Sequence, residues 1–150
     1  MSEVRTHIDI AAPVAHVWAV TIDPQRLPDW VTIHRAFGHI DAGEARAGFR
    51  MDQTLTLRGA PFKVAWTLTE CDPPNRALWH GRGPAGSKAQ TEYLLAEHDG
   101  GTRFTYRNEF QPPLGVLGRL AQRAVAGNIP EAEAKKSLRK LKDICESLRD

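Results

Sequence analysis

Polar and apolar side chains alternate along RFTYRNEF, residues 103 to 110. Phe104, Tyr106 and Phe110 fall on one side of this run and mostly charged residues on the other, a period of two that predicts a strand with one covered face. Asn108 interrupts the apolar side. A covered carboxamide that lacks hydrogen-bond partners costs about 1 to 3 kcal/mol. The sequence therefore predicts either a change of register at Asn108 or a face that borders something other than a dry core.

The same alternation recurs in short runs separated by turn residues, a pattern typical of an antiparallel meander. Two further polar residues, Gln53 and Glu70, stand in otherwise apolar columns of these runs. Within residues 77 to 82 the pattern leaves open whether Trp79 or His80 points inward. The predicted strands are Val4 to Ile10 and then about residues 35 to 41, 48 to 58, 62 to 71, 76 to 83, 88 to 98 and 102 to 110.

A helical period replaces the alternation near both ends of the chain. Pro13 opens a short helix that contains Trp18, and a second short helical segment contains Trp30. Beyond Pro113 the chain is predicted to be helical to its end, with a break near Gly127-Asn128-Ile129 caused by Pro130. Because its apolar stripe must be covered, we expect this helix to lie across the apolar face of a curved sheet in an α+β arrangement. The stripe consists of Leu117, Leu120, Ala124, Leu138, Leu141, Cys145 and Leu148.

Composition and charge narrow the class of protein. The 150 residues, of which 41% are hydrophobic, suit one domain over residues 1 to 150, and no apolar run approaches the roughly 20 residues that span a bilayer. The start of the chain has no apolar segment long enough for a signal peptide, and Cys71 and Cys145 lack metal-like or redox spacing, so the cytoplasm is the expected location. A net charge of +2 does not indicate nucleic acid. The histidines do not cluster with carboxylates, so neither a metal site nor a cofactor is predicted.

Four segments of the chain resemble a known family. They are IDIAAPVAHVWAVTIDPQRLPDWV at 8 to 31, VAWTLTECDPPNRALW at 64 to 79, GGTRFTYRNEF at 100 to 110 and PLGVLGRLAQRAVAGN at 113 to 128. In this order they resemble the polyketide cyclase/dehydrase branch of the SRPBCC superfamily, also called START-like or birch-pollen-allergen-like. The resemblance implies a helix-grip fold, in which a seven-stranded antiparallel sheet wraps around the C-terminal helix and leaves a cavity between them.

The resemblance also gives the unexpected polar residues a role. Asn108 and Gln53 would project from the concave face of the sheet into the cavity, where a ligand or ordered water satisfies them. Glu70 lies next to the Cys71-Asp72-Pro73 turn and is expected at the surface; buried, it could act as a general acid or base. No spacing pairs His80 with a tyrosine into a catalytic unit. The predicted ligand-binding residues are Trp18, Trp30, Gln53, Trp66, Trp79, Tyr93, Tyr106 and Asn108, with the first two near the mouth or end of the cavity.

Three functions remain open at this point. The favoured one is a START-like ligand-binding domain that holds a hydrophobic or ring-containing small molecule, such as a lipid, isoprenoid or polyketide-like compound, as a carrier or sensor. The second is a polyketide cyclase, aromatase or dehydratase that uses acid-base residues of the cavity. The third is a module that binds a protein partner and no ligand. Family membership does not choose between them, because one fold hosts many functions, and the sequence does not determine the oligomeric state.

Overall fold

The computed structural model of the chain describes residues 2–57, 59–112 and 129–147. Within these ranges seven strands form one antiparallel sheet in the order β1-β7-β6-β5-β4-β3-β2. The strands are β1 (Ser2–Ile10), β2 (His34–Ile40), β3 (Arg50–Leu57), β4 (Ala60–Asp72), β5 (Arg76–Arg82), β6 (Lys88–His98) and β7 (Gly101–Gln111). The helices are α1 (Val14–Thr21), α2 (Leu27–Trp30) and α4 (Ile129–Ser147), with single 3-10 turns η1 (Pro24–Arg26) and η2 (Pro84–Gly86).

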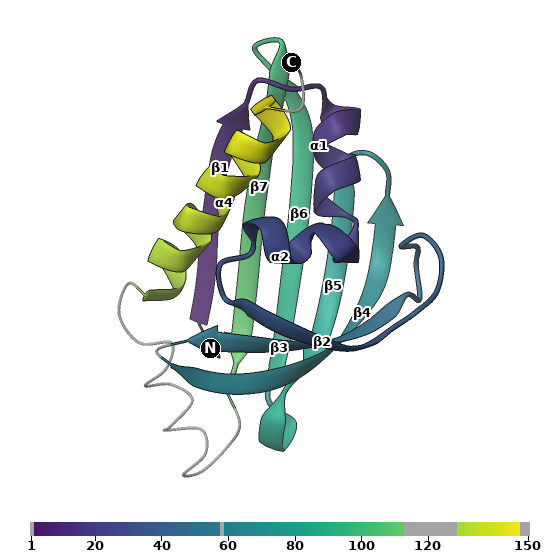
Figure 1. The fold of residues 1–150 in the computed structure, drawn as a ribbon, viewed down its shortest axis with the longest axis vertical. Coiled ribbons are helices and arrows are strands. Elements are labelled where there is room, and N and C mark those ends of the chain that lie inside the picture. The colour runs from purple at the N-terminus through teal and green to yellow at the C-terminus, as the bar shows by residue number, and fades with distance from the viewer. Residues whose placement is uncertain (1, 58, 113–128, 148–150) are drawn as a thin grey trace.

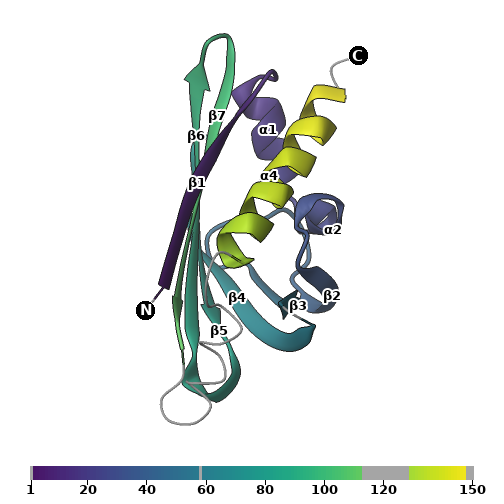
Figure 2. The ribbon, with the colours of Figure 1, turned by 90° about the vertical axis from the view of Figure 1, so that its left-hand side faces the viewer.

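The sheet curves, and its concave side holds the helices (Figures 1 and 2). From β2 to β7 each strand pairs with the next along the chain, and β1 then pairs with β7. Figure 2 shows α4 lying across the concave face, where it packs against β1, α1 and α2. The predicted α+β helix-grip arrangement is confirmed.

The described part of α4 runs from Ile129 to Ser147 and has Pro130 as its second residue. Leu138, Leu141 and Cys145, which belong to the predicted stripe, are buried in the core. The remaining stripe residues, Leu117, Leu120, Ala124 and Leu148, lie outside the described residues, as does the helix predicted between Pro113 and Asn128. Among the described residues, no helix combines the length and apolarity needed to cross a membrane.

A β-bulge in β4 explains why Glu70 does not continue the apolar column. Leu68 pairs with Trp79 but Glu70 pairs with Leu78, so Thr69 is an extra residue that shifts the alternation. Glu70 is exposed, as predicted. The register also decides the ambiguity in β5, because Trp79 is buried in the core whereas His80 is exposed on the outer face.

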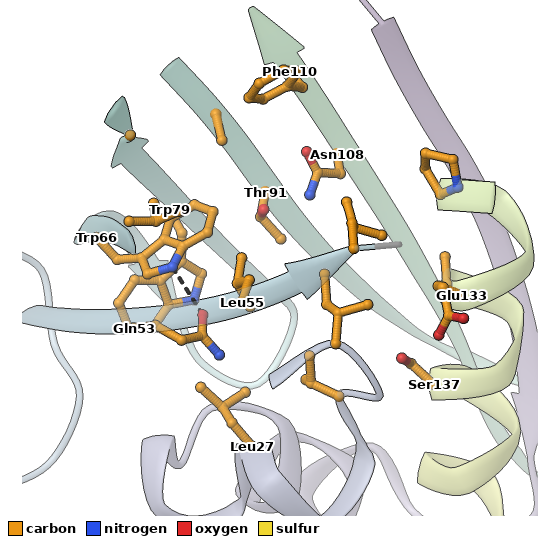
Figure 3. A pocket seen from close by; sticks show the side chains of 18 of the residues that line it. Leu27, Gln53, Leu55, Trp66, Trp79, Thr91, Asn108, Phe110, Glu133 and Ser137 are labelled. Carbon is orange, nitrogen blue, oxygen red and sulfur yellow. Dashed lines mark hydrogen bonds between the residues drawn. The ribbon is translucent and has the colours of Figure 1, made fainter. Parts of the chain in front are cut away.

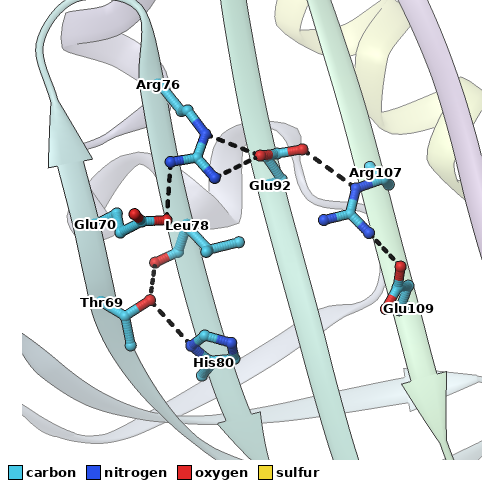
Figure 4. Close-up of polar contacts among 8 residues, drawn as sticks. All are labelled: Thr69, Glu70, Arg76, Leu78, His80, Glu92, Arg107 and Glu109. Carbon is cyan, nitrogen blue, oxygen red and sulfur yellow. Dashed lines mark hydrogen bonds and ion pairs between the residues drawn. The ribbon is translucent and has the colours of Figure 1, made fainter.

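The outer face of the sheet carries a ladder of alternating charges across β4, β5, β6 and β7 (Figure 4). Arg76 bridges Glu70 at 2.8 Å and Glu92 at 2.9 Å, and Arg107 bridges Glu92 and Glu109. The Glu92 side chain is only 12% exposed. Burial acts to raise the pKa of Glu92, but the hydrogen bonds and charges of Arg107 and Arg76 outweigh it and hold that pKa below its ordinary value.

Candidate ligand-binding cavity

A cavity of about 370 Å³ lies between the concave face of the sheet and the helices α2 and α4. All of the predicted ligand-binding residues except Trp18 line it: Trp30, Gln53, Trp66, Trp79, Tyr93, Tyr106 and Asn108. Figure 3 shows side chains of the lining converging from several strands, with α4 opposite. The fold therefore brings together predicted residues that are far apart along the chain.

Trp18 differs from the prediction, because it is buried in the core and does not line the cavity. Its helix, α1, packs against α4, β6 and β7, and in Figure 1 it lies at the end of the sheet away from η2. The sequence predicts that Trp18 lies on a short helix, but this does not distinguish a residue of the solid core from a residue of the cavity wall. Thr21 and Ile22, at the end of α1, reach the cavity instead.

Aromatic rings form much of the cavity wall. Tyr93 stacks at a tilt with Tyr106, with ring centroids 6.3 Å apart, and meets Trp30 edge-on at 5.9 Å. Trp66 lies against Gly81, where an added Cβ would come within 2.8 Å of the indole ring. Glycine is therefore required at residue 81 for the Trp66 ring to lie close to β5.

Gln53 finds its hydrogen-bond partners within the protein. The Trp66 indole Nε1 donates to Gln53 Oε1 at 3.0 Å, and Gln53 Nε2 lies 2.9 Å from His34 Nδ1 (Figure 3 shows the first bond). Because the indole can only donate, the Gln53 oxygen faces Trp66 and its amide donates to His34. His34 Nδ1 is therefore an acceptor in a neutral ring, and burial lowers the pKa of His34 in agreement.

Asn108 keeps its place in the apolar column without any change of register. The pairing of β7 runs unbroken past it, with Asn108 opposite Val4 on one side and Thr91 on the other. The face that it shares with Tyr106 borders the cavity. Asn108 Nδ2 donates to the Tyr106 hydroxyl oxygen at 3.0 Å, and among the described residues the Asn108 amide oxygen has no hydrogen-bond partner.

The two cavity tyrosines remain protonated at neutral pH. Burial raises the pKa of Tyr93, and burial also raises the pKa of Tyr106, although hydrogen bonds from Asn108 and Thr91 oppose that rise. Because Asn108 already donates to the Tyr106 oxygen, the Tyr106 hydroxyl hydrogen is directed elsewhere. This part of the cavity can therefore offer both a donor, Tyr106, and an acceptor, Asn108.

A second polar group at the cavity was not predicted from the sequence. Glu133 and Ser137 lie one turn apart on α4 and line the cavity, and Thr32, between α2 and β2, contacts both. The Thr32 hydroxyl lies 2.6 Å from Glu133 Oε2 and 3.1 Å from Ser137 Oγ, and the Thr32 backbone N–H donates to Ser137 Oγ at 3.0 Å. The one-turn spacing beside Leu138 is a signal of a shared helix face, but nothing in the sequence indicates Thr32 as their partner.

The described residues contain no group of three or more histidine, cysteine, aspartate or glutamate side chains that could hold a metal ion. Within the described lining, Glu133 and Lys88 are the charged residues, and Lys88 is exposed at the start of β6. What the cavity offers a ligand is therefore an aromatic wall with hydrogen-bonding groups at separate points. It is suited to bind a largely apolar molecule that carries a few polar groups.

A curved antiparallel sheet that holds a helix across its concave face, with a cavity between them, defines the helix-grip class of proteins. The chain belongs to the family described as polyketide cyclase/dehydrase and lipid transport, which it matches over residues 1–146, and so to the SRPBCC superfamily.

Proteins similar to this chain occur in several bacteria. Toxin Rv0910 of Mycobacterium tuberculosis is 23% identical over 134 residues, which cover 88% of this chain and 93% of that protein. Among solved structures, TTHA0849 of Thermus thermophilus has a TM-score of 0.81 at 18% identity, covering 99% of this chain and 100% of that one. Protein CV1439 of Chromobacterium violaceum has a TM-score of 0.73 at 20% identity, with coverages of 97% and 99%. At these identities the solved structures establish the fold alone.

Proposed function

We propose that the protein binds a hydrophobic or ring-containing small molecule in this cavity, as a carrier or sensor. The observation that carries the proposal is the cavity of about 370 Å³ with three tryptophans and two tyrosines in its wall. A cavity of this size in an interior that otherwise packs densely is a typical ligand site. The open cavity also favours a ligand over the alternative of a module that binds only a protein partner.

The proposal is tested by native mass spectrometry of the protein purified from its own host, followed by denaturation and identification of any released compound. We expect a stoichiometric lipid, isoprenoid or polycyclic compound. In parallel, stripped protein is titrated with the hydrophobic fluorophore 1-anilinonaphthalene-8-sulfonate. A protein that arrives empty and binds neither this probe nor any member of a hydrophobic library would refute the proposal.

A matched pair of variants tests whether the fluorophore binds inside the cavity. Ala89 lines the cavity on β6, whereas Ala96 is exposed on the same strand. Ala89→Phe places a ring in the cavity and should weaken fluorophore binding by about tenfold or more, and Ala96→Phe should leave it unchanged. Equal affinities in the two variants would place the bound probe outside the cavity.

A second candidate function is cyclisation or dehydration of a polyketide-type substrate, which the family description includes. The specific observation in its favour is the protonated Tyr106 hydroxyl, which is buried beside Asn108 and could donate a hydrogen bond to a substrate carbonyl. Tyr106→Phe removes this donor and keeps the ring. If the protein is an enzyme, the variant should retain ligand affinity within about threefold and lose turnover by about a hundredfold or more. A variant that loses affinity, with no turnover detected in the parent protein, would favour the carrier.

A further inference from the structure

The polar group formed by Thr32, Glu133 and Ser137 lies at the α4 side of the cavity. Figure 3 shows Glu133 and Ser137 projecting from α4, across the cavity from Asn108 on β7. The Ser137 side chain is buried and the Glu133 side chain is 28% exposed. The carboxylate therefore belongs to the cavity lining and is also reached by water.

The hydrogen-bond directions in this group can be worked out from the number of available hydrogens. The Ser137 oxygen accepts the Thr32 backbone N–H. The Thr32 hydroxyl lies 2.6 Å from Glu133 Oε2 and 3.3 Å from the Glu133 backbone carbonyl oxygen, and both of these oxygens can only accept. Its single hydrogen goes to the closer one, the carboxylate oxygen Oε2. The 3.1 Å contact between the two hydroxyls is then filled by the Ser137 hydrogen, which Thr32 accepts. Both hydroxyl hydrogens are thus used within the group: Ser137 donates to Thr32, and Thr32 donates to the Glu133 carboxylate.

As a result, this side of the cavity offers acceptors and no donor from the three residues. A ligand group that only accepts hydrogen bonds, or one that carries negative charge, would find no partner among them and would face the carboxylate. Lys136 compensates the charge only weakly, because its Nζ lies 3.5 Å from Glu133 Oε1 and its side chain is 57% exposed. Thr32 meanwhile holds the carboxylate in place before a ligand arrives, which reduces the cost of ordering it.

We propose that Glu133 is a specificity-determining residue that selects ligands bearing a hydrogen-bond donor, above all a protonated amine, at the end of the molecule that reaches α4. The inference rests on the proposed binding function and extends it to the chemical class of the ligand. At the opposite side, Tyr106 can donate and the Asn108 oxygen can accept. The ligand that fits both sides is an apolar or ring-containing body with an amino group, or less favourably a hydroxyl group, at one end and an oxygen acceptor at the other.

The test uses three probes that share one alkyl chain and differ only in the head group: decylamine, decanol and decanoate. Their affinities for stripped protein are measured by isothermal titration calorimetry at pH 7, where the amine is positively charged and the acid negatively charged. We expect decylamine to bind at least about tenfold more tightly than decanoate. Nonspecific electrostatic attraction would instead favour decanoate, because the chain carries a net charge of +2.

Variants of two glutamates on α4 test whether Glu133 causes the preference for decylamine. Glu133→Gln keeps the size and an oxygen for Thr32 but removes the charge, so it should weaken decylamine binding by about tenfold and change decanol binding by less than about threefold. Glu131→Gln is the control, because Glu131 pairs with Lys135 at 3.4 Å and does not line the cavity. It should leave all three affinities unchanged.

The possible failures are distinguishable. If the three probes bind with similar affinity, or if Glu133→Gln leaves the amine preference intact, the inference is overturned and the proposed cavity function stands. If none of the three binds although the fluorophore binds in the cavity, the inference is overturned and the proposed function still stands. If no hydrophobic probe of any kind binds, the proposed function fails and the inference fails with it.

Discussion

At the scale of single residues, polar side chains within the apolar columns mark where the cavity lies. Gln53 and Asn108 both line the cavity from inward-facing columns of their strands. The protein satisfies the Gln53 side chain through Trp66 and His34, whereas among the described residues the Asn108 side chain bonds only to Tyr106, through one end of its amide. The alternation of the sequence indicated that both face inward. It could not indicate which of the two retains an acceptor for a ligand.

The chain of bonds from Trp66 through Gln53 to His34 gives the protein a specific pH dependence. Burial lowers the pKa of His34 from its ordinary value of 6.5, so the unfolded chain takes up this proton more readily than the folded one. The contribution of His34 to stability is therefore complete above pH 6.5 and is lost progressively as the pH falls through that value towards the lowered pKa. Protonation would also turn Nδ1 into a donor facing the donating Gln53 amide.

His34→Asn tests this dependence, because an asparagine oxygen can replace Nδ1 as an acceptor but does not titrate. Between about pH 7.5 and about pH 5.5 the urea midpoint should fall more in the parent protein than in the variant. His80→Asn is the control, since His80 is exposed and its Nδ1 lies 2.9 Å from the Thr69 hydroxyl, away from the cavity. Parallel midpoint curves for the parent and His34→Asn would contradict the assignment.

At the scale of the elements, the charge ladder on the outer face joins four neighbouring strands. Glu92 is its centre, because it is mostly buried and bonds to both Arg76 and Arg107. Glu70, at one end, is 55% exposed. A buried charge loses more when its partner is removed than an exposed one does, so the members of the ladder should contribute unequally to stability.

Glu92→Gln should lower the free energy of unfolding at pH 7 by about 1.5 to 3 kcal/mol, and Glu70→Gln by less than about 1 kcal/mol. The folded-state pKa of Glu92 lies below its unfolded value, so its contribution is complete above that ordinary value and is lost as the pH falls through the folded pKa. The difference between the parent and Glu92→Gln should therefore shrink in acid. Denaturant titrations at a series of pH values measure it, and a difference that does not change with pH would contradict the argument.

The elements themselves could largely be predicted from local patterns. Alternation and turn residues located the strands because most strands of this sheet have one covered and one wet face. The edge strand β2 is the exception, since its exposure does not alternate. The bulge at Thr69 was not visible in the pattern, and only the nearby turn indicated that Glu70 is exposed. The polar group on α4 escaped prediction because it depends on Thr32, which is 101 residues from Glu133 in the chain.

At the scale of the whole molecule, the regularity of strand pairing differs between the middle of the sheet and its β2 edge. The pairings of β6 with β5 and with β7 run without interruption, whereas β2 is an edge strand whose pairing with β3 is interrupted by register shifts. Local opening requires fewer contacts to be broken at such an edge. The backbone hydrogen bonds in the middle of the sheet should therefore open less readily than those of β2.

Hydrogen-deuterium exchange followed by mass spectrometry should find the slowest amides in β6 and β7 and the fastest strand amides in β2. A bound cavity ligand should slow exchange between α2 and β2, where Val31 and Ile33 line the cavity, and in the first turns of α4. The far end of the β6 and β7 hairpin, residues 96–103, contributes no residue to the cavity lining and provides the internal control. Equal protection of all strands, or ligand protection confined to the far end of the β6 and β7 hairpin, would contradict this expectation.

The pairing of β1 with β7 also determines the order in which the protein can fold during synthesis. Ser2 lies opposite Phe110, so β1 is synthesised before the other strands of this sheet and has no partner in it until β7 has been made. At typical translation rates of about 5 to 20 residues per second, β1 waits for several seconds or more. Exposed charges at Glu3, Arg5 and Asp9 alternate along it, and such charges discourage pairing with other chains. These charges should therefore reduce the aggregation of β1 during the time before β7 is available.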